Sequence, residues 1–416
     1  MRRLRHTLFA AVAMTALTVA ACAPPDTGTD GDSSDGDGGG APASAEDVPD
    51  VPSEPVSLHI IDVAGNLKLT QPMIEAFVEE HPDIISDFTF EAAGAPDLVG
   101  TIKPQVDSGN LQIDLVLSGT DGLSAGIAEN LWVPVVEEFG DRLPGMQNYT
   151  AEAAQMQELA EGYGVLTVYT PSGPLMWFNP NEMDEADVPT TPEELLTWAQ
   201  ANPNRFGYPR PANSGVGRTF LQGLPYMLGD SDPSDPENGW DNTWAYLSEL
   251  DQYIDYYTTG TGQMVQAVAD GTWALTPTTL GWDIEPRADG RAPAEIGAVA
   301  FDEFTFVADS QFALMPQGLS ADKQSAILNL LEYMLTPEVN AIAFDNGYFY
   351  PGPAVEGATI DLAPQSSQDA MAEYGRDWYD DLIANNDAVP PLSAEALVTA
   401  FDIWDREIGG NRVQEG

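Results

Sequence analysis

The segment VSLHIIDVAGNLKLTQPMIEAFVEEHPDIISDFTF, residues 56–90, decides the fold class. A short apolar strand at 56–62 is followed by a turn at Gly65. Apolar residues then repeat with helical spacing over 71–80, Pro82 ends that helix, and a second strand follows near 84–90. Strand, helix and strand in this order predict parallel strands joined by a right-handed crossover, and therefore an α/β protein.

The next segments continue this alternation and contain the first candidate site. We expect a helix near 96–106, a third strand at 113–117 and a helix at 123–130. In parallel sheets ligands bind at the carboxyl ends of strands, where helix N-termini offer free N–H groups. The loop at 118–122 is of this type, so Ser118, Thr120 and Asp121 are candidate ligand contacts. A simple turn that caps the helix is the alternative.

The length predicts two lobes rather than one core, because about 360 of the 416 residues remain after the N-terminal segments. We expect each lobe to be a mixed, mostly parallel sheet flanked by helices, with a hinge between them. The first lobe would comprise 56–165 plus 310–360, and the second lobe 166–309. The chain would cross near 165–174 and return near 299–311, and helices in 361–416 would brace the lobes from outside.

The first 55 residues are predicted to direct and tether the protein. Residues 1–21 have three Arg and a short apolar stretch, as in a secretory signal peptide. The sequence VAAC at 19–22 resembles a bacterial lipobox, with Val19 where Leu is usual, so we expect lipid on Cys22. Ordinary cleavage beside an incidental cysteine is the alternative. Residues 22–55 are rich in Gly, Pro, Ser and Asp and predict a flexible acidic tether.

Composition excludes several classes of function. The formal net charge of −51 argues against nucleic-acid binding and against attraction to an anionic bilayer. The same charge favours adaptation to high salt, which screens repulsion between the carboxylates. One Cys and three His leave little for a zinc site or a His-dependent triad. We therefore expect no metal and no cofactor.

Four later segments carry a resemblance to a known family. They are IDLVLSGTDGLSAGIAENLWVP at 113–134, PLMWFNPNEMDEADVPTTPEELLTWAQANP at 174–203, AVADGTWALTPTT at 267–279, and the stretch from QFALMPQG to GYFYPGP at 311–353. Their order, behind a lipobox, resembles extracellular solute-binding proteins of ABC importers with the type II periplasmic-binding-protein fold. RFGYPRP at 205–211 and GRTFLQG at 217–223 resemble the branch of polyamine, thiamine and iron binders.

The resemblance implies a lipid-anchored receptor on the outer side of the cytoplasmic membrane. Such a receptor is a monomer that closes its lobes over a small solute, delivers it to an ABC permease with its ATPase, and performs no chemistry. The acidic surface conceals any local charge preference, and we favour a small organic cation over a sugar or a metal. A sensory or structural surface lipoprotein of the same fold is the alternative, followed by a secreted hydrolase that uses two carboxylates.

Further candidate contacts lie in loops and aromatic positions expected near the cleft. Each has a structural alternative, namely a loop cap or core packing. An indole could stack on a cation, and an Arg beside glycines could grip a carboxylate or phosphate. These candidates are Trp177, Ser214, Arg218, Thr219, Trp282, Asp283 and Tyr348.

Two metal readings are also open to the sequence. Tyr256 and Tyr257 are paired as ferric-iron ligands are in some members of the resembled family, but spacing from Tyr246 favours one face of a buried helix. The acidic loop at 230–241 has the oxygen ligands that calcium takes, although the sequence favours a solvated surface insertion.

Overall fold

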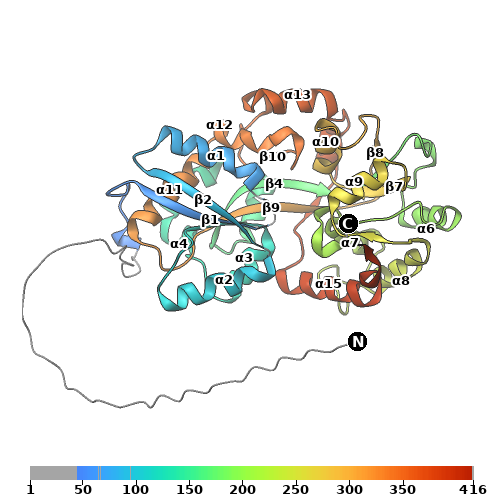
Figure 1. Cartoon of the computed structure of the whole chain (residues 1–416), viewed down its shortest axis with the longest axis horizontal. Coiled ribbons are helices and arrows are strands. Elements are labelled where there is room, and N and C mark those ends of the chain that lie inside the picture. Colours follow the sequence, from blue (N-terminus) through green and yellow to red (C-terminus); the bar gives the residue numbers. More distant parts are fainter. Residues whose placement is uncertain (1–44, 64, 66, 94, 415–416) are drawn as a thin grey trace, which may run out of the picture. The chain divides into compact units, whose positions relative to one another are not determined.

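A seven-stranded mixed sheet is the framework of the first lobe in this computed structural model, which describes residues 45–63, 65, 67–93 and 95–414 (Figure 1). The strand order is β10-β4-β9-β3-β1-β2, with β11 paired to β9. The strands are β1 (Val56–Val63), β2 (Ile85–Ala93), β3 (Leu115–Ser118), β4 (Gly164–Gly173), β9 (Phe306–Leu314), β10 (Gly352–Pro353) and β11 (Ala388–Val389). β1 pairs in parallel with β2 and β3, as the opening segment predicts, whereas β9 runs antiparallel to β3 and β4.

The second lobe contains a three-stranded sheet of order β7-β5-β8. Its strands are β5 (Leu175–Phe178), β7 (Leu275–Thr278) and β8 (Gly297–Val299), and both pairs are antiparallel. The expectation of a mostly parallel sheet is therefore wrong for this lobe. The reason is the long connection from β5 to β7: it contains several helices and does not fix strand direction as a single-helix crossover does. A separate parallel pair joins β6 (Tyr257–Thr258) to β12 (Val413–Gln414).

Helices cover both faces of the large sheet, with α1 and α11 above it and α2 and α3 below it in Figure 1. The helices are α1 (Leu67–Glu80), α2 (Ala95–Ser108), α3 (Thr120–Ala128), α4 (Val135–Phe139), α5 (Ala151–Glu158), α6 (Pro192–Ala201), α7 (Gly215–Met227), α8 (Asp241–Leu250), α9 (Thr261–Ala269), α10 (Leu280–Ala288), α11 (Ala321–Met334), α12 (Pro337–Asn340), α13 (Gln365–Tyr374), α14 (Tyr379–Asn385) and α15 (Ala394–Glu407). Short 3-10 turns are η1 (Ala45–Asp47), η2 (Gly140–Arg142), η3 (Pro144–Asn148), η4 (Glu185–Asp187), η5 (Pro211–Asn213), η6 (Asp251–Tyr253), η7 (Ala341–Gly347), η8 (Ile360–Leu362) and η9 (Gly410–Arg412).

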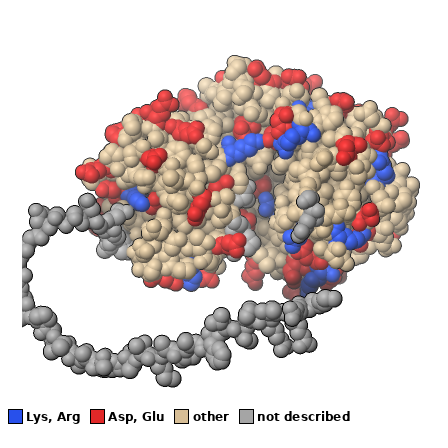
Figure 2. Space-filling view, in the orientation of Figure 1, with Lys and Arg blue, Asp and Glu red and all other residues tan. Residues whose placement is uncertain are grey.

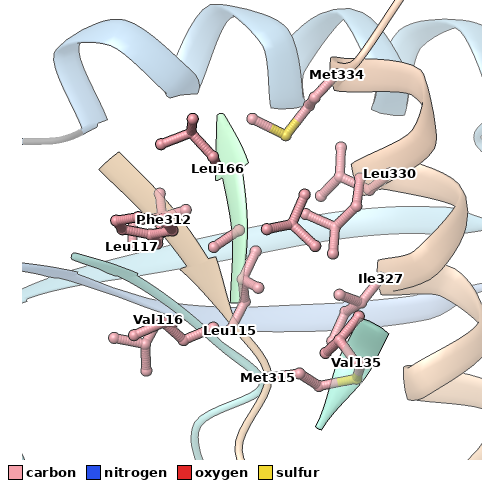
Figure 3. Close-up of a cluster of buried hydrophobic side chains, with 14 of the residues drawn as sticks. Leu115, Val116, Leu117, Val135, Leu166, Phe312, Met315, Ile327, Leu330 and Met334 are labelled. Carbon is pink, nitrogen blue, oxygen red and sulfur yellow. The ribbon is translucent and has the colours of Figure 1, made fainter. Parts of the chain in front are cut away.

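Two large apolar cores support the two lobes. In the first core, side chains of β3 and β9 meet those of α11 (Figure 3). Leu115 and Phe312 are fully buried there, as are Ile327 and Leu330 from the helix. The second core packs around β5 and β7 and includes Leu175, Leu275 and Ile284. Separate cores explain how one chain of this length buries its apolar residues in two lobes.

Two strands carry the chain between the sheets. β4 belongs to the large sheet and β5 to the small one, so the chain passes between them at Pro174. The return runs from β8 to β9 through residues 300–305. β4 and β9 are themselves paired along most of their length. The two connections therefore lie together, as a hinge between lobes requires.

The C-terminal segment contacts both lobes. Leu397, Ala400 and Trp404 of α15 are buried in the second core, and the same helix contacts α3 of the first lobe. α13 packs against α10 and η7.

No helix of the described residues is long and apolar enough to cross a membrane. The predicted signal peptide, Cys22 and most of the predicted tether lie outside the described residues.

Candidate functional site

A cavity of about 750 Å³ lies between the two lobes. Its walls come from α3, β4 and β9 on one side and from α7, α9 and α10 on the other, and the segment after η7 and helix α15 complete it. Figure 2 shows a hollow in this face, with basic side chains inside and beside it, on a surface where acidic side chains are widespread. The volume is within the range of about 300–1,000 Å³ for small-molecule sites.

Several helix N-termini open onto this cavity. Gly119 precedes α3 without a side-chain cap, and Gly215 and Gly281 lie in the first turns of α7 and α10. The caps of these two helices are Ser214, whose Oγ accepts from Gly217 N–H at 3.3 Å, and Thr279, whose Oγ1 accepts from Trp282 N–H at 3.4 Å. The first N–H groups of each helix have no partner within the helix, so they are available to a ligand.

Arg218 and two carboxylates form the charged part of the cavity wall. One guanidinium nitrogen of Arg218 donates to Asp309 Oδ2 at 3.4 Å, and Asp121 lies on the opposite wall. Burial alone would lower the pKa of Arg218, but the Asp309 and Asp121 carboxylates more than offset burial and raise it. Burial raises the pKa of Asp309, and the nearby Arg218 cation reduces this increase. The cationic form of Arg218 is thus favoured at the cavity, whereas burial works against the anionic form of Asp309.

Trp282 and Tyr348 make an aromatic corner of the cavity. Their ring centroids are 5.8 Å apart, with the ring planes at 68°. Lys68 Nζ lies 4.1 Å from the Tyr348 ring centroid, and the Arg291 guanidinium carbon lies 5.3 Å from that of Trp282. Lys68 and Arg291 both form ion pairs with Glu285, so the protein's own cations already use part of the two aromatic faces.

Trp177 and Asp283 are not at the cavity, and their prediction as ligand contacts is corrected. Both side chains are fully buried, and Trp177 Nε1–H donates to Asp283 Oδ1 at 2.8 Å. Asp283 lies in the first turn of α10, not in a loop, and also accepts hydrogen bonds from Arg287, Arg376 and Tyr379. The Asp283 carboxylate is therefore used by the protein's own donors and is not open to a solute. It points into the core rather than to the cavity because adjacent residues of a helix point in different directions, and its neighbour Trp282 takes the cavity side.

The other predicted residues divide between the cavity and its margin. Asp121, Ser214, Arg218, Trp282 and Tyr348 line the cavity together. Thr120 and Thr219 instead line a small adjoining pocket, which Asp121 and Arg218 share. Ser118 is fully buried at the end of β3 behind Gly122. The carboxyl end of β3 therefore does meet the site, but through Asp121 rather than Ser118.

Several cavity residues were missed by sequence reasoning. Asp309, Ser310 and Gln311 lie on β9, for which the sequence predicts only the return of the chain to the first lobe. Helix α15, expected to brace the lobes from outside, supplies Leu397 and Phe401 to the cavity wall. An unusual run of three polar residues within an otherwise apolar strand was the available signal for β9; the contribution of α15 had no local signal.

The segment around Tyr256 and Tyr257 is not one helix. α8 ends at Leu250, and Tyr257 is a buried strand residue whose hydroxyl donates to Asp251 Oδ1 at 2.6 Å. The Tyr256 ring packs on Trp273, with centroids 5.3 Å apart. Both tyrosines therefore serve packing in this structure. In the loop at 230–241, Asp230 accepts from the first N–H groups of α8, so it caps that helix.

Comparisons with known proteins agree with this architecture. Residues 72–373 match the family described as bacterial extracellular solute-binding protein. Protein YnjB of Escherichia coli (strain K12) is 27% identical over 199 residues, which cover 44% of this chain and 48% of that protein. The chain thus matches about half the length of this curated relative.

Solved structures of ABC transporter proteins share the fold. An ABC transporter structure from Clostridium perfringens has a TM-score of 0.62 at 12% identity and covers 86% of this chain and 100% of its own. A putative spermidine/putrescine ABC transporter from Listeria monocytogenes has a TM-score of 0.57 at 15% identity, with coverage of 84% and 97%. At such identities the likeness concerns the two-lobed periplasmic-binding-protein fold.

Proposed function

Since this chain belongs to the bacterial extracellular solute-binding proteins, we propose that it captures a small solute between its lobes and delivers it to the permease and ATPase of an ABC importer. The family places it outside the cytoplasm, in a periplasmic or extracellular location. The observation that carries the proposal is the cavity of about 750 Å³ whose walls come from both lobes. A ligand there contacts both lobes at once.

The mechanism we propose is closure about the paired strands β4 and β9. A solute that touches both walls interacts better with the closed form than with the open one, and this difference supplies the affinity. Ion pairs across the cleft would act in the same direction, since Arg218 of α7 faces Asp309 of β9 and Lys68 of α1 faces Glu285 of α10. No covalent chemistry is part of this function, and the receptor acts as a monomer.

The solute includes an organic cation in this proposal. Within the described residues, the Asp121 carboxylate in the cleft accepts a hydrogen bond only from the neighbouring Gly122 N–H, at 2.9 Å. Trp282 and Tyr348 add aromatic surface on the other wall. Lys68 and Arg291 already use part of these ring faces, so the Asp121 carboxylate is the main partner for an ammonium group.

The test is a thermal-shift screen of the purified full-length chain in high salt, with polyamines, thiamine, ferric iron, sugars, amino acids and organic anions. A ligand present at 100 times its Kd stabilises the folded state by about 2.7 kcal/mol. A shift confined to one chemical class supports the receptor and names its cargo. Absence of any shift, in folded and ligand-free protein, favours the sensory or structural lipoprotein, and turnover of a compound favours the hydrolase.

The membrane anchor we propose is lipid on Cys22. Mass spectrometry of the protein expressed in a bacterial host measures it directly: the wild type should carry a diacylglyceryl mass at the N-terminal cysteine. Cys22→Ser should lose that mass and leave the membrane fraction. A wild-type chain without lipid would contradict the anchor and leave solute binding untouched.

A further inference from the structure

The cavity offers groups of opposite charge to a ligand, each still short of partners. We infer that the solute is zwitterionic, with an acidic group held by Arg218 and the N-termini of α7 and α10, and an ammonium group held by Asp121 and Gln311. The inference rests on the proposed function and narrows the substrate class of the same site.

Arg218 is available to an acidic group. Within the described residues its guanidinium makes one hydrogen bond, the 3.4 Å contact with Asp309, although it carries five N–H donors. It lies beside the start of its own helix, because a Cβ built on Gly215 would be 3.9 Å from an Arg218 terminal nitrogen. A guanidinium fork next to free helix N–H groups matches the oxygens of a carboxylate, phosphonate or phosphate.

Arg210, also in the cavity wall, is different. Both its Nε and a terminal nitrogen donate to Asp405, and a further nitrogen donates to Asn213 Oδ1 at 3.3 Å. This guanidinium is occupied by the protein. The comparison assigns the acidic group to Arg218 and not to Arg210.

Two buried polar atoms on β9 also await a partner. Ser310 and Gln311 line the cavity and are 1% and 4% exposed. Ser310 Oγ and Gln311 Oε1 have no hydrogen-bond partner among the described residues. Leaving a buried polar atom unpaired costs about 1–3 kcal/mol, so a ligand that pairs it gains affinity. Gln311 Oε1 only accepts, so its partner on the solute must be an N–H or O–H donor.

The negative charge of Asp121 makes an ammonium N–H the better donor at this wall. Asp121 forms no ion pair within the described residues, whereas Asp309 is matched to Arg218. A solute with only an ammonium group would leave the Arg218 donors unmatched in the closed cavity. A purely acidic solute would add a negative charge beside Asp121 and Asp309, two carboxylates that already share the Arg218 cation. Both mismatches disappear when the ligand carries both charges.

The experiment compares matched compounds at constant ionic strength by thermal shift on the full-length chain. Each zwitterion is tested beside its amine and its acid: phenylalanine with phenethylamine and hydrocinnamate, γ-aminobutyrate with butylamine and butyrate, and aminomethylphosphonate with methylamine and methylphosphonate. Spermidine, glucose and ferric citrate are added for the receptor function itself. We expect a shift from at least one zwitterion and none from its two analogues.

Other outcomes separate the two claims. If an amine or an acid alone gives a shift equal to that of its zwitterion, the zwitterionic solute is contradicted and the receptor function is supported. The same conclusion follows if only spermidine, glucose or ferric citrate gives a shift. Silence across all compounds, in folded and ligand-free protein, counts against both.

Variants then test the assignment of each charge by calorimetry with the zwitterion that shifts most. Asp121→Asn and Arg218→Lys should each weaken it about tenfold or more; the lysine keeps a cation beside Asp309, so folding is preserved. Asp83→Asn and Arg406→Gln, on exposed surface, are the matched controls and should bind as wild type. Unchanged affinity in either cavity variant overturns the assignment.

Discussion

Asp283 and Asp121 are both acids in the first turn of a helix, yet they sit in opposite environments. Asp283 is fully buried and accepts from Trp177, Arg287, Arg376 and Tyr379. Asp121 lines the cavity and, in the described part of the chain, accepts a hydrogen bond only from the N–H of its neighbour Gly122. A polar group that the protein has fully paired supports the fold, whereas one left short of partners in a cavity is available to a ligand.

The largest expected effect sharpens this comparison at Asp283. Asp283→Asn removes the charge that Arg287 and Arg376 share and leaves both cations without it in the core. We expect a loss of about 3–5 kcal/mol in the free energy of unfolding, measured by guanidinium denaturation. Asp121→Asn should change the same quantity by no more than about 0.5 kcal/mol. Equal losses in the two variants would break the comparison.

The second largest expected loss of stability concerns the close backbone contact between α10 and the segment after η7. A Cβ on Gly281 would lie 1.9 Å from the Tyr348 carbonyl oxygen, so Gly281→Ala must push the two segments apart. We expect a loss of about 1–3 kcal/mol, observed as a lower Tm in calorimetry. Gly262→Ala in the first turn of α9 is the control: nothing lies within 4 Å of its Cβ, and alanine favours the helix there. A harmless Gly281→Ala would show that the corner is loosely packed.

The two tryptophans beside these acids should separate binding from stability. Trp282→Ala removes cavity surface and should lower affinity about tenfold or more, or about 1.4 kcal/mol, with the fold intact. Trp177→Phe removes a donor from Asp283 and should lower stability by about 1–3 kcal/mol while leaving affinity unchanged. Titration calorimetry with the identified solute measures the affinity of each variant, and guanidinium denaturation measures its stability. Wild-type affinity in Trp282→Ala would remove that residue from the site.

The smallest effect concerns Asp345 of η7, three residues before Tyr348 of the aromatic corner. Burial, with Glu285 nearby, raises its pKa from 3.8 to about 6, although Lys68 opposes the shift. A raised pKa means that the folded state holds the proton more tightly, so wild-type stability falls as pH rises from 4 through 6. Asp345→Asn should therefore gain about 1 kcal/mol over the wild type between pH 4 and pH 7.

Denaturation curves of both proteins at each pH measure this difference. Asp83→Asn, in an exposed turn, is the control and should parallel the wild type throughout. A pH-independent difference for Asp345→Asn would contradict the raised pKa.

Much of the fold was predictable because it depends on local patterns. The parallel strands β1 and β2, helix α1 and the α/β class follow from apolar periodicity and punctuation in the sequence, and the two lobes follow from its length. The family was predictable from the order of its segments. Strand direction in the second lobe was not, because β5, β7 and β8 are separated by long connections that local patterns do not constrain.

The site was half predictable for a related reason. Residues beside strand ends and helix starts, such as Asp121, Ser214 and Arg218, were found because those positions face ligands in α/β proteins. Trp177 and Asp283 have the same chemistry, but Trp177 is buried in strand β5, and Asp283 points into the core although its helix neighbour Trp282 lines the cavity.

The sequence by itself determined the two-lobed α/β body and the family, since these rest on chain length, on local periodicity and on the order of segments along the chain. Only the tertiary structure decided which charges have partners. Asp283 and Arg376 are 93 residues apart, and Arg218 and Asp309 are 91 residues apart, yet each pair meets in space. Whether a charge is neutralised by the protein or left for a solute depends on such long-range contacts, which no local pattern encodes.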